Sequence, residues 1–197
     1  MTRGHGWRFL DIGRRLERTS NMTALLRTAL GTPGSAPVGG GGQAAPSVTA
    51  SSVAGGLQAS GRHRIESTLG PLLEIADSAM TYRRRYFAQP QLSPVLDLLV
   101  ADPTNARSLG FQLVVLTDHV KQLPRDKRAP SPTREQRIVA RMISTIAAAD
   151  LDLPEGPEHG GEYPRLTALF RALEEDLRKL SDTITHYYFS HAELRVS

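Results

Sequence analysis

Apolar residues recur at spacings of three and four along most of this chain, the spacing at which side chains share one face of an α-helix. No stretch alternates apolar and polar residues with the two-residue period of a strand. The pattern therefore predicts an all-α fold, a helical bundle of about five or six helices in a single domain over residues 1–197. The expected helices cover about residues 6–30, 64–87, 93–100, 102–123, 131–149 and 162–193.

Short polar residues followed by proline mark the predicted starts of three helices, because they combine an N-cap oxygen with a proline suited to the first turn. These pairs are Ser93-Pro94, Asp102-Pro103 and Ser131-Pro132. Gly70-Pro71 is a candidate break in the second helix. The helix over 102–123 is apolar on two sides, so we expect it to be central. The long C-terminal helix approaches about 50 Å at 1.5 Å per residue, enough to brace the bundle.

Residues 31–61 differ from the rest of the chain in composition. They are rich in Gly, Ser, Ala, Pro and Thr and include four consecutive glycines at 39–42. Such a segment buries too little apolar surface to offset its backbone entropy, so we expect a flexible, disordered loop. A phosphate-binding loop is not supported, because no Gly-Lys-Ser/Thr ends the segment and no strand precedes it.

Two helices each direct one charge of opposite sign toward the apolar side. Glu17 falls at the edge of the apolar face of the first helix, and Arg83 lies in the middle of the apolar stripe of the second. A buried carboxylate is costly unless a cation meets it. We therefore predict that Glu17 and Arg83 pair inside the fold, and we favour a structural ion pair over a binding site.

Composition narrows the functional classes. The absence of cysteine excludes disulfides and thiolate sites and fits a cytoplasmic protein. No window reaches the roughly 18 apolar residues of a membrane span. The net charge of +4 comes almost wholly from arginines spread over every segment, without a nucleic-acid motif, so nucleic-acid binding is not expected. The histidines lack metal-ligand spacing, and we expect neither a metal nor another cofactor.

Three segments carry a resemblance to a known family. They are Gly-Trp-Arg-Phe-Leu-Asp-Ile-Gly-Arg-Arg-Leu-Glu-Arg at 6–18, Tyr-Arg-Arg-Arg-Tyr at 82–86 and Leu-Leu-Val-Ala-Asp-Pro-Thr-Asn-Ala-Arg-Ser-Leu at 98–109. In this order they resemble the bacterial Alpha-E domain, an all-helical domain named for a Glu-Arg motif that Glu17 and Arg18 match. The resemblance implies association with circularly permuted ATP-grasp proteins, and hence a role in making or processing peptide or amide bonds.

Typical members of this family begin with an additional helical region, so the resemblance implies an N-terminally truncated domain. Loss of that region would expose apolar surface. We therefore expect self-association, or binding to a chain that supplies the region, besides the ATP-grasp-type protein partner.

The candidate motif and anion-binding residues lie in the three matching segments. They are Arg14, Glu17, Arg18, Tyr82, Arg83, Arg84, Arg85, Asp102, Asn105 and Arg107. For the arginines and tyrosines, solvated faces and packing at the border of the stripe are the competing interpretations. Asp102 is favoured as a helix N-cap over a catalytic base. Asn105 and Gln112, on the apolar face of the fourth helix, need hydrogen-bond partners if buried.

No residue is assigned as catalytic, because the sequence has no nucleotide loop, metal cluster or activated nucleophile. We favour a non-catalytic helical accessory module that acts with an ATP-grasp-type ligase in peptide or amide-bond synthesis or processing. The alternatives are an enzyme of amide-bond chemistry that uses Glu17 and the arginines, and a truncated remnant without independent function.

Overall fold

The computed structural model describes residues 4–30, 65–124, 131–153 and 163–190, and every regular element in these ranges is a helix. The elements are α1 His5–Leu30, a helix over residues 65–75, α3 Ala79–Tyr86, α4 Leu92–Leu96, the π-helix η1 Asp97–Ala101, α5 Leu109–Lys121, α6 Arg134–Ala147 and α7 Pro164–Tyr188. The predicted all-α class is confirmed, and so is the long C-terminal helix.

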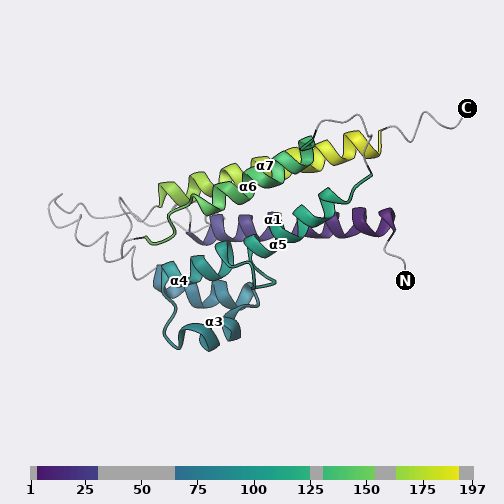
Figure 1. Cartoon of the computed structure of the whole chain (residues 1–197). Coiled ribbons are helices and arrows are strands. Elements are labelled where there is room, and N and C mark those ends of the chain that lie inside the picture. Colours follow the sequence, from purple (N-terminus) through teal and green to yellow (C-terminus); the bar gives the residue numbers. More distant parts are fainter. Residues whose placement is uncertain (1–3, 31–64, 125–130, 154–162, 191–197) are drawn as a thin grey trace, which may run out of the picture.

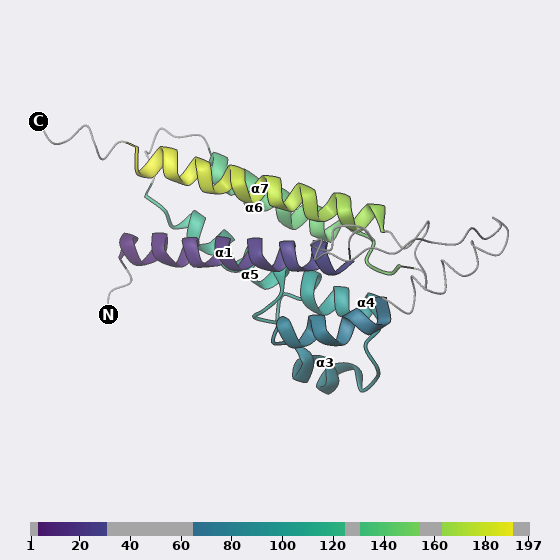
Figure 2. The ribbon, with the colours of Figure 1, turned by 180° about the vertical axis from the view of Figure 1, so that it is seen from behind.

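Four long helices form the main bundle (Figure 1). α1 packs against α5 and α7, and α6 packs against the same two helices, so that the four close a ring. Neighbouring helices run in opposite directions in both views (Figure 2). Their inner faces bury residues such as Ile12, Leu113, Met142 and Leu180. Because α5 also contacts η1, the predicted central position of this helix is confirmed.

The shorter helices lie beside the bundle at the end where α1 finishes and α5 begins (Figure 1). η1 joins the two parts, since it contacts both α5 and α6. Leu98, Leu99 and Val100 of η1 are completely buried. η1 and α5 approach so closely that a Cβ atom on Gly110 would lie 2.5 Å from the Ala101 carbonyl oxygen. Glycine at this position is what permits the contact.

The predicted second helix is interrupted, but not at Gly70-Pro71. The helix continues through that pair, because the burial of Leu69, Leu72 and Leu73 around the proline offsets the hydrogen bond that it removes. The break falls at residues 76–78, where Asp77 adopts a positive φ of 49°. α3 then starts in a new direction, so its buried face does not continue that of the preceding helix.

The starts of three helices differ from the proline-based predictions. α4 begins one residue before Ser93, with Gln91 as its N-cap. α5 begins at Leu109 with Ser108 as its N-cap, because residues 102–108 form a loop. α6 begins after Thr133, whose backbone amide donates to the Gln136 side chain at 3.2 Å, and not after Ser131. Of these three N-cap residues, Ser108 satisfies a free amide of the first turn, because its hydroxyl oxygen accepts from the Phe111 amide at 3.0 Å.

Some predictions concern residues outside the described ranges. The glycine-rich segment 31–61 is one of them, as are the last residues of the predicted C-terminal helix. Within the described part, α7 ends at Tyr188, so its 25 residues extend over about 37 Å instead of 50 Å. No helix among the described residues is both long enough and apolar enough to cross a membrane.

Candidate functional site

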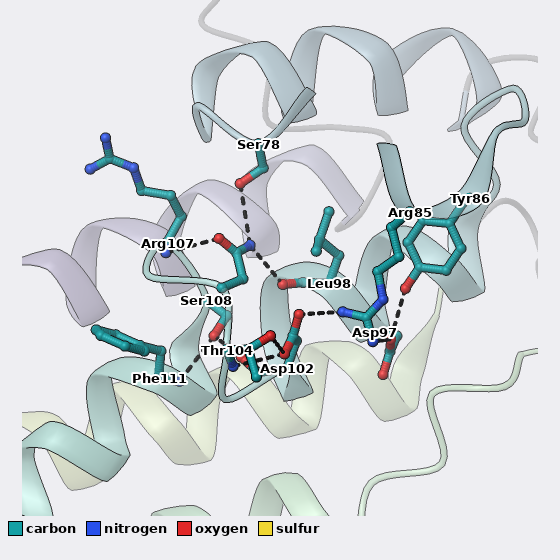
Figure 3. A network of polar contacts seen from close by, with 11 residues as sticks. Ser78, Arg85, Tyr86, Asp97, Leu98, Asp102, Thr104, Arg107, Ser108 and Phe111 are labelled. Carbon is teal, nitrogen blue, oxygen red and sulfur yellow. Dashed lines mark hydrogen bonds and ion pairs between the residues drawn. The ribbon is translucent and has the colours of Figure 1, made fainter. Parts of the chain in front are cut away.

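The loop over residues 102–108 is held in place by buried polar contacts (Figure 3). The side-chain amide of Asn105 donates to the Leu98 carbonyl at 3.0 Å, and its oxygen accepts from the Arg107 backbone amide at 3.1 Å. Ser108 donates to the Asp102 carbonyl and caps α5 by accepting from the Phe111 amide at 3.0 Å. Asn105 thus has the partners that its burial requires, although it lies in this loop and not on a helix.

Asp102 anchors the start of the same loop. Its carboxylate accepts from the amide and the hydroxyl of Thr104 at 2.8 and 2.7 Å, and it forms an ion pair with Arg85 of α3. Burial opposes ionisation, yet the hydrogen bonds from Thr104 and the Arg85 charge hold the pKa of Asp102 below its ordinary value. The predicted N-cap role is wrong, because Asp102 ends η1 and stabilises the loop that precedes α5.

Two tyrosines of α3 complete the contact between α3 and α4–η1. The Tyr86 hydroxyl donates to Asp97 at 2.8 Å, and burial together with this carboxylate raises the pKa of Tyr86 to about 12. The ring of Tyr82 lies 4.8 Å from that of Tyr86, centroid to centroid. Its hydroxyl donates to the Gln89 carbonyl and accepts from the Gln91 amide, both at 3.1 Å. These tyrosines therefore have structural partners.

The predicted buried pair of Glu17 and Arg83 is wrong. Glu17 is exposed, because the buried face of α1 contains Ile12 and Thr19 and Glu17 lies about 140° around the helix from Ile12. Arg83 is also exposed and lies 3.7 Å from Glu74. The break at residues 76–78 changes the orientation of α3, which turns Tyr82 inward in place of Arg83.

A groove between α1 and the loop over residues 102–108, which we call the polar loop, brings together two of the predicted candidates. Arg18 of α1 and Arg107 of the loop both border it, and its volume is about 420 Å³. Its apolar lining consists of Met22, Leu25, Ile75, Ala76 and Ala106. We call this feature the Arg18 groove. Its size falls in the range of small-molecule sites, and it combines an apolar lining with a few polar groups, as such sites do.

The two arginines of the Arg18 groove differ in their surroundings. Arg107 forms an ion pair with Asp77, which also borders the groove. Arg18 is exposed, and its side chain has no hydrogen bond or ion pair with any described residue. Its planar guanidinium is therefore available to bind an anionic group through two parallel hydrogen bonds.

A polar chain that the sequence did not reveal supports one wall of the groove. Gln112 donates to the Ala106 carbonyl at 2.6 Å and accepts from Arg15 at 3.0 Å. Arg15 contacts Asp11 at 3.2 Å, and the same carboxylate lies 2.7 Å from His119. Burial acts against the Asp11 charge, but the hydrogen bonds from His119 and Arg15 lower the pKa of Asp11.

Two sequence signals point to this chain: the four-residue spacing of Asp11 and Arg15, which places them on one side of α1, and Gln112, which was expected to need partners if buried and is buried. Arg15 is not among the predicted candidates, and it is half-buried against α5. The predicted candidates Arg14 and Arg84 are exposed on α1 and α3 and take no part in either network within the described residues.

The site therefore has two parts with different chemistry. Asp102, Asn105, Arg85 and Tyr86 are engaged in contacts that fix the loop, whereas Arg18 faces the groove without a partner among the described residues. No group of three or more His, Asp or Glu side chains in the described part of the chain is placed to hold a metal ion. Such an arrangement is suited to binding an anion.

Fold and site together define a helical protein with a rigid polar loop beside a groove bordered by arginine. The Alpha-E family, described as a predicted α-helical domain with a conserved ER motif, matches residues 1–189. The chain therefore belongs to the Alpha-E family. Glu17-Arg18 is the Glu-Arg pair of this sequence, and it is the pair that the resemblance predicts to match the family's motif.

Three mycobacterial proteins are similar in sequence to this chain. Uncharacterised proteins of Mycobacterium bovis and of two strains of Mycobacterium tuberculosis are each 27% identical to this chain over 182 residues. The match covers 91% of this chain but 17% of each relative, so the chain spans about a sixth of their length. No solved structure shows significant similarity to the chain.

Proposed function

We propose that this chain is a non-catalytic helical module that acts with an ATP-grasp-type ligase in the synthesis or processing of peptide or amide bonds. The observation that carries the proposal is the position of Arg18. An arginine in the predicted Glu-Arg motif needs a reason for its presence, and the side chain of Arg18 makes no hydrogen bond or ion pair with any described residue. A contact outside the chain supplies that reason.

The surroundings of the other candidates support a binding role over a catalytic one. Asp102 is the buried carboxylate of the polar loop, and Thr104 and Arg85 already engage both of its oxygens. A general base needs a free oxygen in reach of a substrate proton. Asp102 therefore acts on the shape of the loop, and through Arg107 on the border of the Arg18 groove.

The mycobacterial relatives agree with an accessory role. They contain the matching region within a chain about six times as long, so in them the region is joined to other segments. We infer that this region acts through another protein segment that it contacts. The ATP-grasp-type ligase is the partner that the family resemblance implies.

The test is a co-purification followed by a ligation assay. The tagged full chain is mixed with a circularly permuted ATP-grasp protein from the same organism, and peptide ligation with ATP is measured with and without the chain. We expect a complex and faster ligation in its presence. An Arg18→Gln variant should bind the partner about tenfold more weakly, while an Arg14→Gln variant, altered at another exposed arginine of α1, should bind like the wild type.

Two results would contradict the proposal. If the two proteins do not associate and the ligation rate is unchanged, the chain is not a module of this ligase. If the chain alone ligates peptides with ATP, it is the enzyme that the sequence left open as an alternative.

A further inference from the structure

We propose that the Arg18 groove binds the C-terminal carboxylate of an amino acid or short peptide with an apolar side chain. The inference rests on the proposed function, because it names the kind of substrate group that the module would present to the ligase. It is carried by a guanidinium without an internal partner, placed at the edge of an apolar groove.

The charge of the groove favours a singly charged anion. The groove is bordered by two guanidinium groups, those of Arg18 and Arg107, and by one carboxylate, that of Asp77. Asp77 and Arg107 form an ion pair, so the unbalanced charge is that of Arg18. A carboxylate matches the two parallel N–H donors of a guanidinium and restores the balance.

The lining of the groove favours an apolar group next to that carboxylate. Met22 and Leu25 are half-buried and Ile75 is 70% exposed, so the groove presents apolar surface to water. A side chain that covers this surface releases the water from it, which favours binding. An unbranched methionine also adapts to side chains of different shape.

Polar groups on the walls fit the backbone of such a ligand. Gln112 is held by Arg15 and the Ala106 carbonyl, which makes this wall rigid. Asn21 borders the groove and makes no hydrogen bond with any residue of the described ranges, so its amide is available to a peptide group. Free phosphate has no apolar group to cover the apolar lining, which is why we favour the carboxylate of an apolar ligand.

The experiment is an NMR titration of the isotope-labelled full chain with three probes: N-acetyl-leucine, N-acetyl-leucinamide and inorganic phosphate. We expect N-acetyl-leucine to shift the amide signals of residues 18–25, 75–77 and 106–112 with saturation. N-acetyl-leucinamide lacks the carboxylate and should bind about tenfold more weakly or worse, as the loss of a charge-assisted hydrogen bond implies. Phosphate should bind more weakly than N-acetyl-leucine.

Variants separate a specific site from general attraction to a basic protein. Arg18→Gln should weaken N-acetyl-leucine binding about tenfold, and Arg18→Lys should retain part of the affinity as a point charge. The matched control is Arg137→Gln, because Arg137 is an exposed arginine of α6 that borders a different groove. This variant should bind like the wild type. Circular dichroism spectra check that all three variants are folded.

Several outcomes would overturn the inference. Equal affinity for N-acetyl-leucine and N-acetyl-leucinamide would show that the groove does not recognise the carboxylate. Tighter binding of phosphate than of N-acetyl-leucine would indicate a phosphate site instead. Equal losses in Arg18→Gln and Arg137→Gln would mean attraction to net charge alone. Absence of N-acetyl-leucine binding by a chain that still associates with the ligase would refute this inference and leave the proposed function standing.

Discussion

Replacing Gly110 with alanine tests the contact between η1 and α5 on which the position of the polar loop depends. The added Cβ would lie 2.5 Å from the Ala101 carbonyl oxygen and 3.3 Å from that of Val100. Both are backbone atoms, so no side-chain rotation relieves the clash. Overpacking of this kind costs about 1–3 kcal/mol. We expect Gly110→Ala to lower the free energy of unfolding by about 2 kcal/mol.

The control is a second helical glycine without such a neighbour. Gly13 of α1 is exposed and has no atom within 4 Å of the added Cβ. The higher helix propensity of alanine should then stabilise the Gly13→Ala variant by up to about 1 kcal/mol. The two substitutions are chemically identical, so helix propensity alone predicts the same sign for both, and the structure predicts opposite signs.

Urea denaturation followed by circular dichroism measures both changes, and thermal unfolding offers a second scale. For a chain of this size, 1 kcal/mol shifts Tm by roughly 2–4 °C. The reasoning is refuted if Gly110→Ala is as stable as the wild type or more stable, because η1 and α5 would then not approach each other as closely as described.

Three further predictions concern the polar networks. Asp102→Ala should lower the free energy of unfolding by about 2 kcal/mol, which urea denaturation measures. This loss is smaller than the roughly 3–5 kcal/mol typical of removing one partner of a fully buried ion pair, because Arg85 is half exposed. The Asp11 pKa is lowered in the folded state, so its contribution is complete above about pH 4 and is lost as the pH falls further; Asp11→Asn should flatten the acid side of a stability–pH curve. In a spectrophotometric titration, Tyr86 should ionise at a pH of about 12, and Tyr86→Phe should remove that step.

Each of these predictions has a control in the chain. Asp118 is an exposed carboxylate of α5 without a partner in the described ranges, so Asp118→Ala and Asp118→Asn should change stability by less than about 0.5 kcal/mol. A loss in Asp118→Ala equal to that in Asp102→Ala would argue against the loop anchor. If the acid side of the stability–pH curve is the same in Asp11→Asn as in the wild type, the Asp11 carboxylate does not contribute to stability as described. Loss of a step near pH 10 in Tyr86→Phe would show that Tyr86 is not perturbed.

The sequence predicted the long helices well, because each contains a strong repeat of apolar residues. α1 ends at Leu30 as expected, where glycine and proline follow. Which face of each helix is buried was harder to predict. The buried face of α1 includes Thr19 and Thr23, whose hydroxyls bond to carbonyls one turn earlier, and polar residues of this kind carry no apolar signal. The face was therefore placed too close to Glu17.

The polar loop was beyond the reach of pattern reasoning for a different reason. Asp102-Pro103 has the same local signature as a helix start, and only contacts distant in sequence distinguish the two outcomes. Arg85 reaches Asp102 from α3, and the Leu98 carbonyl of a π-helix accepts from Asn105. The sequence analysis singled out the segments that carry these residues, whereas the contacts among them depend on the tertiary fold.

The affinity of Arg18→Gln for the ATP-grasp-type ligase, measured against the wild type by isothermal titration calorimetry, tests the central claim most directly. The account holds that Arg18 acts outside the chain, so we predict that binding weakens about tenfold while the urea midpoint of the variant changes by no more than that of Arg14→Gln. Unchanged affinity for the ligase, or a loss of stability that accounts for the loss of binding, would contradict the account.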